Sequence, residues 1–307
     1  MHVFVTGASG HIGSLVVREL VGSGHRVTGL ARSDDAEEAV RSSGAQVLRG
    51  TLQDLDTLAA GAAAADGVIH LGFIHDFTAY AAAIAVDLAA IQAMGAALAD
   101  SDRPLVSTSG TAMLAFGPGS RDRTGTEDDE VDPSGPRVAS ERATLALADA
   151  GVRSVVIRLP PTVHGPTDHR GFIPTLIANA RARGRSLYIG DGANRWPAVH
   201  NLDAARLYRL ALESAPAGAT LHGAAEEGIV FGDIARTIGV QLGVPAISVS
   251  AEQALDELDF VGAIAALDNP TSSLLTRELL DWQPEHPGLI ADLTAGHYTA
   301  LGATSSG

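Results

Sequence analysis

The chain has 307 residues, no cysteine and a formal net charge of −15 at pH 7. Its length is enough to bury a large core, and 46% hydrophobic with 19% charged residues is the composition of a folded globular protein. The lack of cysteine excludes disulfides, thiolate metal sites and cysteine nucleophiles. The acidity argues against nucleic acid as a partner, because phosphate binding needs a basic surface.

No targeting or membrane segment is expected. Met1 leads directly into an apolar segment, without the basic and apolar regions of a secretory signal. The alanine-rich run 79–99 is interrupted by Asp87, Gln92 and Gly95, so we interpret it as a buried helix. We therefore expect a cytoplasmic protein with no membrane partner.

The first 160 residues alternate apolar β-type segments with helical segments. Strands are predicted at 2–6, 26–30, 45–49, 67–71, 104–108 and 154–159. Helices are predicted at 12–22, 36–43, 55–60, 79–98 and 138–150. This alternation predicts an α/β fold with a Rossmann-type, doubly wound parallel sheet covered on both faces.

The rhythm changes after residue 160, and we assign residues 161–307 mainly to a smaller C-terminal substrate-binding lobe. Helices are predicted at 173–183, 202–212 and 231–242, and strands at 187–189 and 220–222. Some of these elements can return to the sheet of the dinucleotide-binding domain, residues 1–160. A substrate lobe is expected near the carboxyl edge of the strands, where open α/β sheets bind ligands.

A glycine-rich loop follows the first strand, Thr6-Gly7-Ala8-Ser9-Gly10-His11-Ile12-Gly13. In the pattern G-x-x-G-x-x-G, Gly7 permits a tight turn, Gly10 lets the backbone approach a pyrophosphate, and Gly13 lets helix and strand pack closely. The helix that follows offers free N–H groups to phosphate. We therefore predict a dinucleotide site that includes Ser9, His11 and Ile12.

The end of the second strand indicates which dinucleotide is bound. A carboxylate at this place usually binds the ribose 2′-hydroxyl of NAD, but this chain has Ala31-Arg32-Ser33. A guanidinium and a hydroxyl suit a 2′-phosphate, although Asp34 and Asp35 follow closely. We predict NADP(H) as the cofactor, with NAD(H) as the alternative.

With these residues, the sequence resembles the extended and atypical short-chain dehydrogenase/reductases, the NAD-dependent epimerase/dehydratase-like superfamily. The resemblance covers nearly the whole chain, including Val106–Ser109 and the runs 158–166, 199–205 and 280–284. It implies that Ser109 is the catalytic hydroxyl at the end of the fifth strand. It also implies further cofactor contacts at Thr51, Leu52, Leu71, Gly72, Phe73, Pro160 and Val163.

One departure from the family concerns catalysis. The family's Tyr-x-x-x-Lys pair is matched best by Arg137 and Glu141. Tyr normally delivers a proton while Lys lowers its pKa and holds the ribose, and an arginine cannot donate a proton usefully. Arg137 and Glu141 stand four residues apart, so we expect them to pair along one helix.

Another residue must then supply the proton. Histidine titrates near neutral pH, and His75, His164 and His200 are each expected near the cleft. Tyr80 and Tyr188 are weaker candidates. The sequence shows no spaced metal-ligand motif, so we expect no metal.

The favoured function is NADP(H)-dependent reduction of a small carbonyl or related compound. The first alternative is a non-catalytic dinucleotide-binding redox sensor of the NmrA type, which the loss of Tyr and Lys favours. A sugar-nucleotide epimerase or dehydratase fits the architecture but suffers most from that loss. A small-molecule substrate is expected in the first case, and a homodimer is left open.

Overall fold

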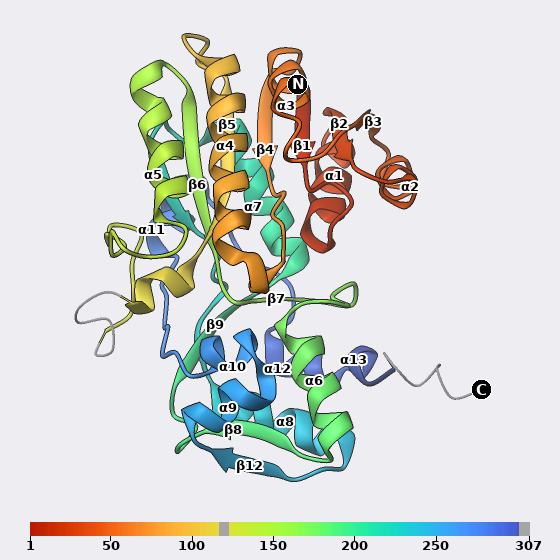
Figure 1. Ribbon diagram of the computed structural model, residues 1–307, viewed down its shortest axis with the longest axis vertical. Helices are drawn as coiled ribbons and strands as arrows, with labels where there is room; N and C mark the ends of the chain where they lie inside the picture. The colour runs from red at the N-terminus through yellow and green to blue at the C-terminus, as the bar shows by residue number, and fades with distance from the viewer. Residues whose placement is uncertain (117–122, 301–307) are drawn as a thin grey trace.

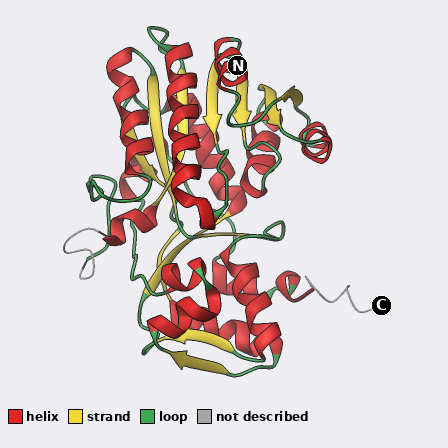
Figure 2. Ribbon diagram, in the orientation of Figure 1, coloured by secondary structure: helices red, strands yellow, loops and turns green. Residues whose placement is uncertain are grey.

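A computed structural model describes residues 1–116 and 123–300. Its largest sheet, counted over these residues, has seven parallel strands with helices on both faces (Figures 1 and 2). The strand order is β10 (Ala219–His222), β6 (Arg153–Leu159), β5 (Pro104–Gly110), β4 (Gly67–His70), β1 (His2–Thr6), β2 (Arg26–Ala31) and β3 (Gln46–Arg49). The prediction of a Rossmann-type doubly wound sheet is confirmed.

The central strands are apolar on both faces because helices cover both. Val3, Phe4 and Val5 of β1 are all fully buried. β1 lies between β2 and β4, so that Val3 pairs with Val27 on one side and with Gly67 on the other. Such continuous apolar strands are typical of parallel sheets with two covered faces.

The helices divide into two layers. The first layer contains α1 (His11–Gly22), α2 (Asp34–Ser42) and α7 (Asn201–Ser214), which share one hydrophobic core with the sheet. The second contains α3 (Leu55–Ala63), α4 (Tyr80–Leu98) and α5 (Val138–Ala146), with the short 3₁₀ helices η1 (Phe77–Ala79), η2 (Thr111–Phe116) and η4 (Leu147–Ala150). The two cores on opposite faces fix the sheet in the middle.

Among the described helices, α4 is the one whose length and apolar composition would allow it to cross a membrane. It packs against α3 and α5 instead. Ala83, Ala90 and Met94 are buried on the side that faces the sheet, whereas Ala85 and Ala96 are exposed. The expected buried helix is therefore buried along one side only.

Residues beyond 160 also contribute to the sheet layer. The helix α7 covers the sheet and β10 pairs in parallel with β6, with Leu221 opposite Ile157. Residues 301–307 of the expected second domain lie outside the described residues.

The remaining elements form the smaller lobe, which lies below the sheet in Figure 1. Sheets are formed by β11 (Glu226–Val230), β9 (Arg195–His200) and β7 (Thr162–His164), and by β12 (Ala246–Val249) and β8 (Ser186–Ile189). The helices of the lobe are α6 (Phe172–Arg183), α8 (Phe231–Leu242), α9 (Ala251–Leu258), α10 (Phe260–Ala265), α12 (Leu289–Thr294) and α13 (His297–Ala300). The helix α11 (Leu274–Leu280) lies beside the sheet layer instead, where it contacts α7 and β10 (Figure 1). Trp196 anchors the lobe: it is fully buried, and its ring lies 4.8 Å from that of Phe231.

Candidate dinucleotide and substrate site

The glycine-rich loop lies between β1 and α1 and has the backbone that the pattern requires. Gly7 has a φ of +68°, and a Cβ there would lie 2.7 Å from the backbone nitrogen of Gly72. A Cβ on Gly13 would lie 2.0 Å from the carbonyl oxygen of Gly7. These two positions admit only glycine, because the opposing atoms belong to the backbone.

Gly10 differs from its two neighbours. A Cβ there would meet, within 4 Å, only the carbonyl oxygen of Gly7 at 3.1 Å, so its other side is open. Gly10 is the N-cap of α1 and provides no side-chain cap for the first-turn N–H groups. The residues present therefore fit a pyrophosphate at this helix end, with the N–H groups of His11, Ile12 and Gly13 as donors.

Two arginines lie at the expected adenosine end of the site. Arg32 follows β2 and is exposed, without a hydrogen bond or ion pair to any described residue. Arg49 on β3 pairs with Asp34 at 2.8 Å and with Glu37 at 2.5 Å. Its charge offsets that of Asp34, one of the two carboxylates that follow Arg32 and Ser33. The Ser33 hydroxyl caps α2 by accepting from the Ala36 N–H.

Thr51 and Leu52 follow β3 on the same side of the loop. The Thr51 hydroxyl donates to Asp54 at 2.8 Å, so its side chain supports the local turn. Leu52 lies against Gly72, where a Cβ would come within 2.9 Å of a Leu52 methyl group. Leu52 and Gly72 thus lie side by side, and their contact with a dinucleotide stays a prediction.

The loop after β4 continues toward the other end of the cofactor site. The N–H of Gly72 donates to the Thr6 hydroxyl at 3.1 Å, and that hydroxyl lies 2.7 Å from Nδ1 of His70. Leu71 and Phe73 follow the loop as half-buried side chains. The dinucleotide loop and the β4 loop are thereby joined by buried hydrogen bonds.

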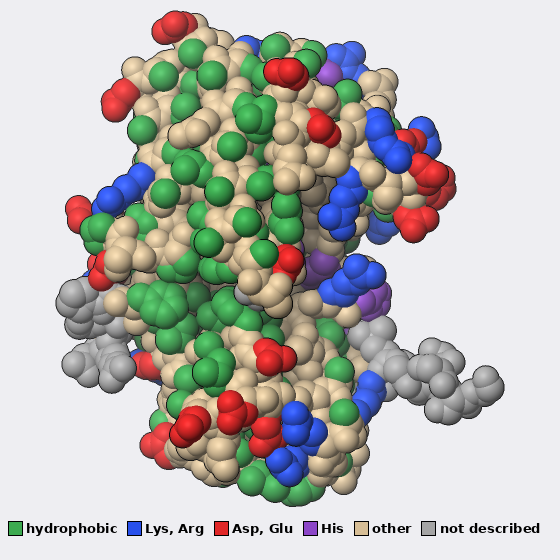
Figure 3. Space-filling view, viewed as in Figure 1, with side chains coloured by type: hydrophobic (Ala, Val, Ile, Leu, Met, Phe, Trp, Pro, Cys, Tyr) green, Lys and Arg blue, Asp and Glu red, His purple; other side chains and the backbone are tan. Residues whose placement is uncertain are grey.

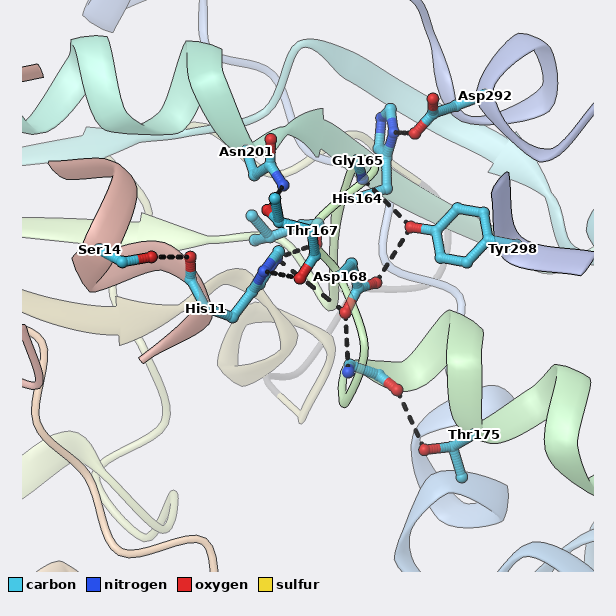
Figure 4. A network of polar contacts seen from close by, with 12 residues as sticks. His11, Ser14, His164, Gly165, Thr167, Asp168, Thr175, Asn201, Asp292 and Tyr298 are labelled. Carbon is cyan, nitrogen blue, oxygen red and sulfur yellow. Dashed lines mark hydrogen bonds and ion pairs between the residues drawn. The ribbon is translucent and has the colours of Figure 1, made fainter. Parts of the chain in front are cut away.

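The imidazole of His11 contributes in a different way than expected. Its Nδ1 lies 3.1 Å from the carbonyl oxygen of Thr167, and its Nε2 lies 3.1 Å from that of Val163 (Figure 4). The side chain therefore ties the start of α1 to β7 and the loop that follows it, which leaves the backbone N–H of His11 as its donor for a phosphate. Pro160, at the end of β6, is buried.

Sequence reasoning missed the network that continues from this contact (Figure 4). The Tyr298 hydroxyl accepts from the Gly165 N–H and donates to Asp168, both at 3.1 Å. Asp168 also accepts from the Gly171 N–H at the start of α6, at 2.8 Å. These partners are up to 133 positions apart along the chain, which is why no local pattern reveals them.

The expected pair between Arg137 and Glu141 does not form. Arg137, the N-cap of α5, donates from Nη2 to the Thr108 carbonyl oxygen at 2.9 Å and to Asp87 at 3.2 Å. Glu141 instead accepts from Nη2 of Arg158 at 2.6 Å, and both side chains are buried. Each residue has a buried partner on another element. A buried partner stabilises the side chain more than an exposed pair along one helix would, since such a pair contributes only a few tenths of a kcal/mol.

Ser109 and Arg137 each present a polar atom without a partner among the described residues. Ser109 lies near the end of β5 and is 5% exposed, and its hydroxyl makes no hydrogen bond. The Nε of Arg137 is also buried and unpaired. Buried polar groups nearly always have a partner in native proteins, so these two point to a ligand atom.

Of the three expected histidines, His75 lies beside Arg137. The His75 ring lies 5.5 Å from Phe73, and the Arg137 guanidinium lies over the same Phe73 ring at 4.4 Å. Desolvation and the positive charge of Arg137 lower the pKa of His75. Figure 3 shows hydrophobic side chains gathered where the sheet layer meets the smaller lobe.

His164 and His200 each use one ring nitrogen for a structural contact, and Nε2 of His164 is buried without a partner among the described residues. His164 is fully buried, with its Nδ1 2.8 Å from Asp292. His200 caps α7, because its Nδ1 accepts from the Leu202 N–H. Burial lowers the pKa of His200 to about 4, helped by the nearby rings of His164 and His286.

A cavity of about 280 Å³ lies beside η2. Its walls include Leu114, Asp129, Val131 and Asn269. Neither Ser109 nor Arg137 lines it, so it is separate from the unpaired polar atoms described above.

Fold and loop geometry together define a Rossmann-type dinucleotide-binding protein. Residues 3–222 match the family model described as the NAD dependent epimerase/dehydratase family. The chain belongs to this family, which confirms the expected resemblance to short-chain dehydrogenase/reductases.

Similar proteins include one from Schizosaccharomyces pombe described as uncharacterized, which is 48% identical over 97% of this chain and 100% of its own. A 2-alkyl-3-oxoalkanoate reductase from Stenotrophomonas maltophilia is 31% identical over 73% of this chain and 69% of its own. Among solved structures, the dTDP-glucose 4,6-dehydratase DesIV from Streptomyces venezuelae, with NAD and TYD bound, has a TM-score of 0.78 at 19% identity, covering 96% and 97% of the two chains. The reductase relatives and the family support an oxidoreductase with a nicotinamide nucleotide.

Proposed function

We propose that this protein is a cytoplasmic, NADP(H)-dependent reductase of a small carbonyl compound. The observation that carries the proposal is the pair of buried, unpaired donors, the Ser109 hydroxyl and the Arg137 Nε, at the carboxyl end of β5. Arg137 contacts the backbone of Thr108, the residue before Ser109, through its Nη2. Two donors carried by neighbouring segments suit an oxygen atom that gains negative charge during reduction.

The dinucleotide supplies a hydride when it is bound. The chain's own residues do the rest. The loop at Gly7, Gly10 and Gly13 would hold the phosphates, and the guanidinium of Arg32 would bind the 2′-phosphate of NADP(H). Ser109 and Arg137 orient the substrate oxygen and stabilise the charge that develops on it.

A related enzyme suggests where to look for the substrate. The Stenotrophomonas maltophilia relative is a reductase of 2-alkyl-3-oxoalkanoates, which contain a ketone. The test is NADPH oxidation at 340 nm with 3-oxoalkanoates, simple ketones, aldehydes and imines. We expect substrate-dependent oxidation with at least one class, lowered by Ser109→Ala.

The second candidate is a redox sensor that binds the dinucleotide without catalysis. The buried ion pair of Glu141 and Arg158 favours it, because no lysine stands there to hold the ribose. Tight NADPH binding without oxidation by any of the four compound classes would support this second candidate and count against the reductase.

A further inference from the structure

We propose that the phenol of Tyr80 donates the proton in this reaction and that Arg137 is the cation beside it. A tyrosine from α4 and an arginine from α5 would then replace the family's Tyr-x-x-x-Lys pair, whose two residues lie on one helix. The proposal rests on the proposed function, carbonyl reduction, and adds which residue donates the proton in that reaction.

The arrangement is centred on the ring of Phe73, in the loop that follows β4. The Arg137 guanidinium carbon lies 4.4 Å from the centre of this ring. The Tyr80 ring lies 6.0 Å from it, at an interplanar angle of 69°. Phe73 is therefore in contact with both groups, at the place where the cofactor loop ends.

Tyr80 also borders the smaller lobe. Its ring lies 5.9 Å from that of Phe260 at the start of α10, and the side chain is half-buried. It thus stands between Phe73 of the sheet layer and Phe260 of the lobe. A substrate held between the two parts would lie against this ring.

The other tyrosines of the chain are placed elsewhere; all four lie in the described residues. Tyr208 is fully buried on α7, and its hydroxyl is 2.7 Å from that of Thr108. Tyr298 is fully buried beside Asp168. Tyr188 lies on β8 in the smaller lobe, 6.0 Å from the guanidinium carbon of Arg236. Tyr80 is the tyrosine that shares Phe73 with Arg137.

A chain of buried hydrogen bonds holds Arg137 in place. His70 Nδ1 lies 2.7 Å from the Thr6 hydroxyl, and its Nε2 lies 3.3 Å from Asp87. Asp87 is 1% exposed and pairs with Nη2 of Arg137. The cation is thereby tied to Thr6, the residue before the glycine-rich loop.

The step balances with the reduced dinucleotide as the second reactant. The carbonyl carbon accepts a hydride from the dinucleotide, which is oxidised, while the carbonyl oxygen takes the proton as the O–H bond of Tyr80 breaks. The phenolate regains a proton from water. Burial raises the pKa of Tyr80, so the phenol keeps its proton at neutral pH, and the charge of Arg137 opposes that rise.

The first experiment measures kcat/KM for NADPH oxidation with the most active compound of the carbonyl panel. Tyr80→Phe should lower it about 10²–10⁴-fold, as expected for loss of a positioned acid, without changing the Kd for NADPH. Tyr188→Phe is the matched control, a tyrosine beside an arginine away from the cleft, and should keep full activity. Full activity in Tyr80→Phe, or loss only in His75→Gln, would overturn the proposal.

The second experiment needs no turnover, so it separates this proposal from the proposed function. Phenolate absorbance at 295 nm is followed against pH in four proteins: the wild type, Arg137→Met, Tyr80→Phe and the double variant. Subtracting the curve of the protein without Tyr80 from that of the matching protein with Tyr80 gives the titration of Tyr80 alone. We expect the pKa of Tyr80 to rise by about 1 in Arg137→Met, because an opposite charge no longer favours the phenolate. An unchanged pKa would refute the pairing even in an active enzyme. Failure of the whole carbonyl panel with a normal titration would refute the proposed function instead.

Discussion

Arg137 and Asp87 form a buried ion pair between the start of α5 and the middle of α4, with Nη2 of Arg137 3.2 Å from Oδ2 of Asp87. The pair joins two helices across the carboxyl ends of β4 and β5, because Asp87 also lies 3.3 Å from His70 and Arg137 also contacts Thr108. It brings a fixed cation to the position where the family resemblance expects a tyrosine.

Removal of Asp87 should destabilise the fold. Asp87→Ala leaves the arginine and His70 without their buried acceptor, and we expect the free energy of unfolding in urea to fall by about 3 kcal/mol. Asp34→Ala is the control, since that ion pair with Arg49 is exposed and should cost less than about 1 kcal/mol. Equal effects of the two substitutions would show that the pair of Asp87 and Arg137 is not a structural element.

The dinucleotide preference should depend on Arg32. We expect NADPH to bind at least tenfold more tightly than NADH, a difference of about 1.4 kcal/mol, because the guanidinium would pair with the 2′-phosphate. Arg32→Asp should reverse this order by repelling that phosphate. Calorimetric titration of both cofactors measures it, and equal dissociation constants in the wild type would refute the assignment.

The glycine-rich loop allows a test that separates binding from folding. Gly10→Val should abolish NADPH binding and leave the fold intact, because the added side chain enters the open space meant for the pyrophosphate. Gly22→Val is the control, as a Cβ there meets nothing within 4 Å. Circular dichroism measures whether the variant is folded, and calorimetry measures its Kd for NADPH. A near-normal Kd in a folded Gly10→Val protein would show that the phosphates bind elsewhere.

Acid should destabilise the protein through buried neutral histidines. Burial lowers the pKa of His222 to about 4, as it does for His200. The unfolded chain binds these protons near pH 6.5 and the folded protein only near pH 4, so stability is full above about pH 6.5 and falls as the pH drops toward 4.

The measurement is Tm between pH 7 and pH 4.5. His222→Gln, which can still donate to Ser272 and accept from Arg158, should show a shallower fall than the wild type. His169→Gln changes an exposed loop position and should leave the slope unchanged. A wild-type slope in His222→Gln would remove this ring as a cause.

The sequence predicted the sheet layer well because its signals are local. Apolar strands, helices and the G-x-x-G-x-x-G loop each lie within about twenty consecutive residues, and every strand predicted before residue 160 is present. In the smaller lobe β7, β9, β11 and β12 were missed. Of these, β7 has only three residues, and Glu226–Val230 has no continuous apolar run to reveal it.

The site residues were harder to predict because their partners are distant in sequence. Asp87 stood out only as an interruption in an alanine-rich helix, yet it holds Arg137 fifty positions away. His164 and His200 were candidate acids from their position in the chain, but the structure gives Nδ1 of each ring a distant or helix-capping partner, Asp292 for His164 and the N-terminus of α7 for His200. A buried acid in an apolar helix is the signal that points to such a partner.

The proposed reaction transfers a hydride from NADPH to a carbonyl carbon. The most direct measurement is mass spectrometry of the product formed from NADPH that carries two deuterium atoms at C4 of the nicotinamide. With the carbonyl panel, we predict an alcohol with one deuterium on the former carbonyl carbon for the wild type, and no such product for Gly10→Val. Absence of deuterated product from the folded, NADPH-binding wild type would contradict the account.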